Sequence, residues 1–298
     1  MLASNTTAQL LALIAVVIWS TIASAFKLSL RYFEVSELVF YSALTSLLFL
    51  LFFLLATNKF SMLATLSRQQ YFRLLLLGLL NPLLYYSVLL YAYDQLPAQM
   101  AQSINYIWGI ALSLLSVPLL GHKLQSCDLF ALVAGLLGVV IIATQGDLAS
   151  LNFNNPFGVA LALASTIILA MYWILAARQE LDPGIVLFVA FLFATPFALI
   201  VMLIDVGFNI PNLNGVFGAI YIGVFEMGLT FLLWLHALKL TDNSSRIASL
   251  IFLSPILSFI FISNIVGEKI HLSTLVGFGF ILLGLLTQKY FSDTTGRD

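Results

Sequence analysis

Ten apolar segments, each about as long as a bilayer is thick, dominate this sequence and restrict what it can fold into. A membrane-spanning helix needs about 20 mostly apolar residues to cross a hydrocarbon core of about 30 Å. Lipid tolerates only helices and closed barrels, and these segments are too long and too evenly apolar for barrel strands. We therefore predict an all-α integral membrane protein with ten transmembrane helices, at 8–28, 36–56, 73–93, 98–120, 128–144, 157–176, 185–205, 214–238, 244–266 and 272–290.

Charge and cysteine content exclude several classes of protein. Only 8% of the 298 residues are charged and the formal net charge is −1, so there is neither the surface of a soluble domain nor a basic patch for nucleic acid. The single cysteine, Cys127, excludes an intramolecular disulfide and a multi-cysteine metal site. The sequence contains no P-loop, H-E-x-x-H or G-x-S-x-G motif. We expect no enzymatic activity, no metal, no cofactor and no nucleic-acid partner, and the sequence does not predict an oligomeric state.

The distribution of basic residues predicts the orientation in the membrane. With the N-terminus in the cytoplasm, nine of the twelve Lys and Arg residues lie in cytoplasmic connections or tails. The exceptions are Lys27, Arg31 and Lys269, and the first two adjoin the first span, which often carries the most weight. We predict that both termini are cytoplasmic and that the protein resides in the inner (plasma) membrane of a bacterial cell.

The two halves of the chain resemble each other. An offset of 146 residues aligns 109–123 with 255–269, and both segments end in Gly-x-Lys. A similar offset of 145 pairs Gly78 with Gly223. Each half holds five spans, and because five is odd the second half must enter the membrane from the opposite side. We predict two inverted five-helix repeats, residues 1–150 and 151–298, an architecture of secondary transporters with a substrate site near the midplane.

Short motifs add a resemblance to a known family. These motifs are Trp19-Ser20-Thr21, Ala237-Leu238-Lys239, Leu253-Ser254-Pro255 and Gly267-Glu268-Lys269. With them, residues 8–290 resemble the drug/metabolite transporter superfamily, in the form with two EamA-type halves. The run from Ile104 to Trp108 is similar to one in the aromatic amino-acid exporter branch. The resemblance implies export of small metabolites, with both termini inside the cell.

Glu226 is the acidic residue that lies deepest within a predicted span. A charge at the centre of a bilayer costs about 2.5–3.5 kcal/mol, so such a residue normally faces a cavity or a partner. Glu226 could bind a substrate cation, carry a coupling proton, or form a structural hydrogen bond. Thr230 and Trp234 follow at four and eight residues, and a regular helix would place them on the same face.

Other polar and aromatic side chains within the spans predict a central cavity. Gln99, Gln102 and Tyr106 recur at helical spacing, where they could line a cavity or join helices. Asn81 and Tyr85 lie four residues apart beside Pro82, which could kink the span. Trp19 and Trp173 could line the cavity or anchor their spans at the membrane interface. The predicted substrate-binding residues are Trp19, Asn81, Tyr85, Gln102, Tyr106, Trp173, Glu226 and Trp234, with Glu226 also the coupling residue.

These features favour a secondary transporter, in particular an exporter of small metabolites such as amino acids or related compounds. It would work by alternating access around the central cavity, with a small-molecule substrate and the lipid bilayer as partners and protons as a further possible partner. The alternatives are an exporter of cationic drugs or nucleosides, and a channel or scaffold that transports nothing. One buried carboxylate offers little toward the rings of charge that a channel needs.

Overall fold

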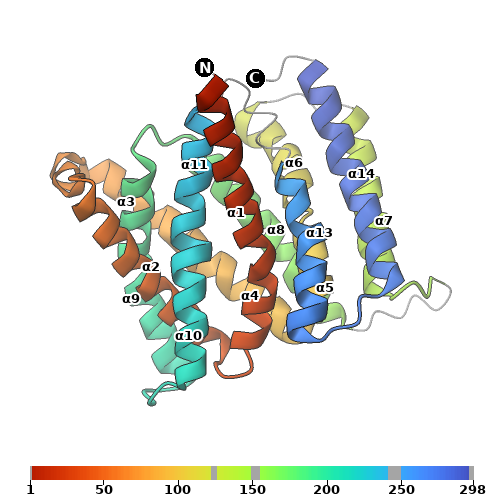
Figure 1. The fold of residues 1–298 in the computed structure, drawn as a ribbon, viewed down its shortest axis with the longest axis horizontal. Helices are drawn as coiled ribbons and strands as arrows, with labels where there is room; N and C mark the ends of the chain where they lie inside the picture. The colour runs from red at the N-terminus through yellow and green to blue at the C-terminus, as the bar shows by residue number, and fades with distance from the viewer. Residues whose placement is uncertain (1, 122–125, 149–154, 241–249, 295–298) are drawn as a thin grey trace. The chain divides into compact units, whose positions relative to one another are not determined.

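The computed structural model describes residues 2–121, 126–148, 155–240 and 250–294, and this part of the chain is helical with short turns and no strand (Figure 1). Its α-helices are α1 (Leu2–Ser29), α2 (Val35–Ala56), α3 (Arg68–Gly78), α4 (Tyr85–Gln95), α5 (Ala98–Asn105), α6 (Trp108–Leu120), α7 (Ser126–Ala143), α8 (Pro156–Ala177), α9 (Pro183–Asp205), α10 (Leu213–Tyr221), α11 (Thr230–Leu240), α13 (Leu253–Phe261) and α14 (Leu272–Thr294). Shorter helical segments are η1 (Phe60–Thr65), η2 (Leu79–Leu84), η3 (Ile222–Leu229), η4 (Leu250–Phe252) and η5 (Ile262–Val266).

These helices confirm the predicted all-α membrane fold. Within the described residues, nine helical runs are long and apolar enough to cross a bilayer. A further apolar run, Leu250–Val266, coincides with the ninth predicted span, whose first six residues, 244–249, lie outside the described residues. The protein is therefore an integral membrane protein.

Three of the predicted spans, the third, fourth and eighth, are interrupted within their length, and in the third the sequence offered Pro82 as a point where the helix could kink. In the third span Asn81 has non-helical backbone angles, φ −147° and ψ 115°, within the π-helical segment η2. The fourth span bends between α5 and α6 at Tyr106 and Ile107. The eighth span contains the π-helical segment η3 between α10 and α11. π-Helical turns such as those in the third and eighth spans are frequent at functional sites.

The chain divides into two compact units, and each unit draws on both halves of the sequence. Unit 1 comprises residues 1–87 and 179–267, and unit 2 comprises residues 88–178 and 268–298. The units are therefore not the two sequence repeats, and the division of the chain at residue 150 stays a prediction.

In unit 1, α2 and α9 pack together and are joined near both of their ends. At one end Lys59 forms an ion pair with Asp182, with Nζ 2.7 Å from Oδ2. At the other end the Ser36 hydroxyl donates to the Asp205 carboxylate over 2.7 Å. The two helices therefore form a pair with a defined register.

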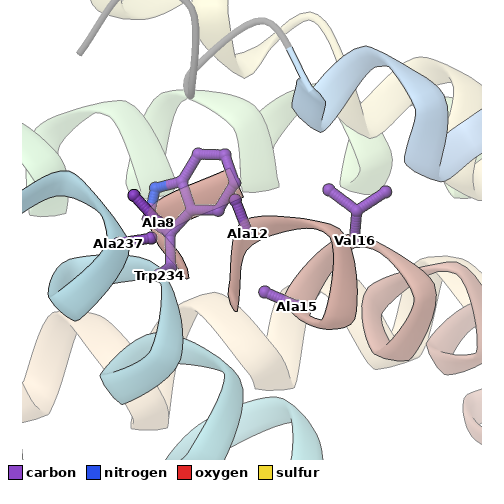
Figure 2. Close-up of a cluster of buried hydrophobic side chains, with 6 residues drawn as sticks. All are labelled: Ala8, Ala12, Ala15, Val16, Trp234 and Ala237. Carbon is purple, nitrogen blue, oxygen red and sulfur yellow. The ribbon is translucent and has the colours of Figure 1, made fainter. Parts of the chain in front are cut away.

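Also in unit 1, α1 packs along α11 through a face of small residues (Figure 2). Ala8, Ala12 and Ala15 recur at helical spacing and are fully buried. Their short side chains leave room for the indole of Trp234, which is 8% exposed and lies over Ala8 and Ala12. Small residues at helix interfaces allow such close packing in membranes, where burial itself contributes little.

In unit 2, α7 and α14 lie side by side (Figure 1). Gly138 of α7 faces Gly277 of α14, and neither position has room for a Cβ atom beside the opposite backbone. Gly284 approaches the Ala131 backbone in the same way, with 3.0 Å between its ideal Cβ position and the carbonyl oxygen. Gly138, Gly277 and Gly284 therefore bring the two helices together.

Candidate substrate and coupling site

Glu226 lies in the middle of the interrupted eighth span, on the π-helical segment η3. The Thr230 hydroxyl donates to the carbonyl of Phe225, five residues back, and so satisfies a backbone acceptor that the wider turn frees. The prediction that Thr230 extends the Glu226 face assumed a regular helix. In the structure Thr230 is fully buried and supports the turn that carries Glu226.

The carboxyl group of Glu226 has one firm partner within the described residues. Tyr86 Oη donates a hydrogen bond to Oε1 over 3.0 Å. The Trp19 indole also interacts with the carboxyl. The second oxygen, Oε2, is buried, and no donor among the described residues reaches it with hydrogen-bond geometry. A buried acceptor without a donor costs about 1–3 kcal/mol, and more if it is charged, so this oxygen is an expected contact point for a ligand or a proton.

Aromatic rings surround this carboxyl. Trp19 contacts Phe231 edge to face at 6.0 Å between ring centroids, and it packs against Trp234 at 5.3 Å. Tyr86 is held by Tyr85 at 4.9 Å and by Phe26 at 6.2 Å. Of the predicted residues, Trp19 is half-buried beside Glu226, whereas Trp234 is buried against α1 and supports the Trp19 ring.

Among the described residues, the side chains recorded as acting on the Glu226 carboxyl are Tyr86 and Trp19, and neither carries a positive charge. On the α2 side, Ser42, Thr45 and Phe49 face Gly223 and Gly228 of η3. On α10, the Tyr221 hydroxyl is engaged with Thr21 over 2.7 Å. The titratable group recorded in contact with the carboxyl is thus the Tyr86 hydroxyl.

Asn81 occupies, in the first repeat, the position that Glu226 occupies in the second. The offset of 145 that pairs Gly78 with Gly223 also pairs Asn81 with Glu226, and both polar residues lie at interruptions. The two glycines make equivalent contacts: Gly78 abuts the Ala190 backbone of α9, and Gly223 abuts the Ser42 backbone of α2. In each case the glycine of one repeat contacts a helix of the other repeat, as an inverted repeat predicts. The repeat therefore also relates Asn81 to Glu226.

The remaining predicted residues belong to unit 2. Gln102 is 6% exposed on α5. Tyr106 ends that helix and contacts Phe278 edge to face at 5.8 Å. Trp173 of α8 packs against Trp108 in a tilted arrangement, with 6.3 Å between the ring centroids. The structure thus groups Trp19, Tyr85, Glu226 and Trp234 in one cluster, while a single cavity lined by all eight predicted residues stays a prediction.

A clasp between α5 and the connection before α14 was not predicted from the sequence. We define the clasp as Ala98 and Gln99 with residues 268–271. Glu268 accepts hydrogen bonds from the backbone amides of Ala98 (2.8 Å) and Gln99 (3.3 Å). The Gln99 amide donates to the Lys269 carbonyl over 2.8 Å and accepts from the His271 amide over 2.9 Å. Gln99 therefore joins protein segments, although the sequence grouped it with the polar stripe of Gln102.

The clasp leads to a prediction about stability. Pro97 precedes α5 and offers no side-chain cap, so the first amides of the helix depend on Glu268. Replacing Glu268 by alanine should lower the free energy of unfolding by about 1 kcal/mol, the usual value of such a cap. Thermal unfolding in detergent measures this loss. Lys269→Ala is the control and should change little, because the clasp uses only the carbonyl of Lys269.

Asp128 and Tyr86 are two further polar residues that the sequence analysis missed. Asp128 lies at the start of α7 and is 1% exposed, and it accepts hydrogen bonds from Ser113 (2.9 Å) and Gln288 (3.3 Å). Tyr86 was missed because the regular-helix pattern favoured Tyr85 as the partner of Asn81. Pro82 was the available signal, since a proline inside a span disturbs the helical register.

The sequence matches a known protein family in both halves of the chain. The model of the EamA-like transporter family matches residues 6–144 and again residues 156–287. The chain belongs to the EamA-like transporter family. The two matches agree with the two-repeat architecture and with the predicted superfamily, and the family is one of transporters.

An individual relative and a solved structure resemble this EamA-like protein at low sequence identity. An uncharacterized transporter of Clostridium kluyveri is 25% identical over 187 residues. That match covers 60% of this chain and 59% of the relative, so it spans less than two thirds of the relative's length. A solved crystal structure aligns with a TM-score of 0.68 over 98% of this chain and 99% of its own, at 18% identity. That likeness concerns the fold alone.

Proposed function

We propose that this EamA-like transporter is a secondary exporter of small organic metabolites that operates by alternating access. The observation that carries the proposal is the Glu226 carboxyl, which lies in the middle of an apolar span with one oxygen lacking a complete hydrogen bond to any described residue. Intramembrane carboxyls of this kind mark substrate or proton pathways. The π-helical segment that carries Glu226 and the interruption at Asn81 free backbone groups at equivalent positions of the two repeats.

In this proposal Glu226 alternates between a proton and the substrate. A carboxyl in an apolar setting is stable when it is protonated or paired with a cation, and unstable as an isolated anion. Tyr86 donates a hydrogen bond to one oxygen, and Trp19, which interacts with the carboxyl, packs against Phe231. Loading one partner therefore favours release of the other, which is the requirement for exchange.

Counterflow in proteoliposomes tests the proposal. A library of small metabolites is first screened by thermal shift, where a ligand present at about 100 times its Kd adds about 2.7 kcal/mol to stability. Each stabilising compound is then loaded inside vesicles, and uptake of the labelled compound is followed. A transporter shows saturable exchange that depends on the internal compound. A channel would not saturate, and a scaffold would show no uptake, so either result would contradict the proposal.

The proposed orientation predicts a labelling pattern. Ile210, in the connection between α9 and α10, is 95% exposed and should face outward, while Ser61 in η1 is exposed and should face the cytoplasm. In a Cys127→Ser background, Ile210→Cys should react with a membrane-impermeant maleimide in intact cells, whereas Ser61→Cys should react only after lysis. The reverse pattern would invert the topology.

A further inference from the structure

The Glu226 carboxyl offers a ligand an acceptor that the described residues leave open. Tyr86 occupies Oε1, whereas Oε2 is buried without a complete hydrogen bond. A donor supplied by a ligand would remove the cost of this open acceptor. A positively charged donor would also neutralise the carboxylate, which in an apolar setting is worth more than a neutral hydrogen bond.

The surroundings of the carboxyl suit a cation with an apolar body. Trp19 and Phe231 are both half-buried and meet edge to face, and the Trp19 indole interacts with the carboxyl. The faces of such rings carry partial negative charge and attract ammonium groups, by about 0.5–2 kcal/mol per contact. The same rings provide apolar surface for the rest of a small organic molecule.

The distribution of basic residues argues against a zwitterion. Every Lys and Arg in the sequence lies outside the predicted spans or within two residues of a predicted span end. The ion pair recorded among the described residues, Lys59–Asp182, lies just outside the ends of α2 and α9. An amino acid would also bring a carboxylate to the Glu226 site, where among the described residues no Lys or Arg is recorded acting on the carboxyl, and burying an unpaired charge is costly.

We propose that the Glu226 site binds a small organic monocation, a primary amine with an apolar or aromatic body, in preference to the corresponding amino acid. The inference rests on the proposed transport function and names its substrate class. The ammonium group donates to Oε2 of Glu226, Tyr86 keeps the carboxyl oriented, and Trp19 and Phe231 contact the body of the ligand.

Matched pairs of compounds that differ only by a carboxylate test this inference. The pairs are 2-phenylethylamine with phenylalanine, tryptamine with tryptophan, and isoamylamine with leucine, and binding to the purified full-length protein is measured by calorimetry. We expect at least one amine to bind with a Kd about tenfold or more below that of its amino acid. Glu226→Gln should weaken that amine about tenfold or more, because it removes the charge partner. Glu180→Gln, an exposed acid outside the helices, is the matched control and should bind normally.

The opposite results would overturn the inference. An amino acid that binds as tightly as its amine, an amine whose Kd is unchanged in Glu226→Gln, or the failure of all three amines to bind would each contradict it. If Glu226→Gln does not fold, the pH dependence of amine binding to the wild-type protein is the test. Protons compete with the amine for the carboxyl, so the affinity must weaken as the pH falls. An affinity that does not change with pH would contradict the inference. Counterflow separates the two proposals. Transport of a neutral or zwitterionic metabolite alone would leave the transport function standing, whereas an amine that binds through Glu226 without exchange would contradict the transport function.

Discussion

Glutamine at position 226 is expected to abolish transport driven by a pH gradient while leaving the protein folded and inserted. The substitution preserves the size of the side chain, and the amide oxygen can still accept the hydrogen bond from Tyr86. It removes the titratable group that we propose exchanges a proton for the substrate. Substrate accumulation in proteoliposomes with an imposed pH gradient should therefore fall to the level of empty vesicles. Size-exclusion chromatography and thermal unfolding should match those of the wild type.

Two further variants serve as controls for the Glu226→Gln experiment. Glu180→Gln changes an exposed carboxylate outside the helices and should retain full gradient-driven transport. Glu226→Asp keeps a titratable group at the site, and partial activity there would show that titration matters. If Glu226→Gln transports at the wild-type rate with an unchanged pH profile, Glu226 has only a structural role and proton coupling through it is excluded.

Alanine at Gly223 should strongly destabilise unit 1. A Cβ atom there would collide with the backbone carbonyl of Ser42, and it would lie 2.7 Å from the Thr45 Cβ and 3.0 Å from the Ser46 nitrogen. Backbone atoms of packed helices cannot rotate away as a side chain can, so η3 and α2 must separate. Overpacking of this kind typically costs about 1–3 kcal/mol. We expect a lower yield of monodisperse protein and a lower midpoint of thermal unfolding.

Position 279 provides the matched control for this substitution. Gly279 lies in α14, and a Cβ atom there would meet no heavy atom within 4 Å, so Gly279→Ala should be neutral or slightly stabilising. Gly78→Ala should resemble Gly223→Ala, because Gly78 meets the Ala190 backbone in the equivalent way. Equal stability of Gly223→Ala and Gly279→Ala would show that the close approach of η3 to α2 does not matter.

The sequence alone determined the fold class and the approximate position of each span. Bilayer thickness imposes a length on every apolar segment, so composition and length together are sufficient to place it. The predicted span at 36–56 corresponds to α2 at Val35–Ala56, and the predicted span at 185–205 corresponds to α9 at Pro183–Asp205. The family also followed from local patterns, because the two repeats and the short motifs are properties of the chain that need no knowledge of contacts.

Glu226 could be identified from the sequence for a similar reason. An acid in the middle of an apolar segment is costly wherever the neighbouring helices lie, so its importance can be inferred without a structure. Its partners could not be inferred in this way. Counting in steps of four residues favoured Tyr85, Thr230 and Trp234, yet the turns at η2 and η3 are π-helical and break that count.

Only the tertiary structure decided which side chains meet. Tyr86 and Glu226 are 140 residues apart, and Gln99 and His271 are 172 residues apart, so neither contact leaves a local pattern. The same applies to the division into two units, each of which combines segments from both halves of the chain. The lipid bilayer constrains the length and polarity of each helix but does not determine which helices are neighbours. That choice rests on close backbone approach at glycines such as Gly78 and Gly223 and on a few buried hydrogen bonds, which exist only once the helices have packed.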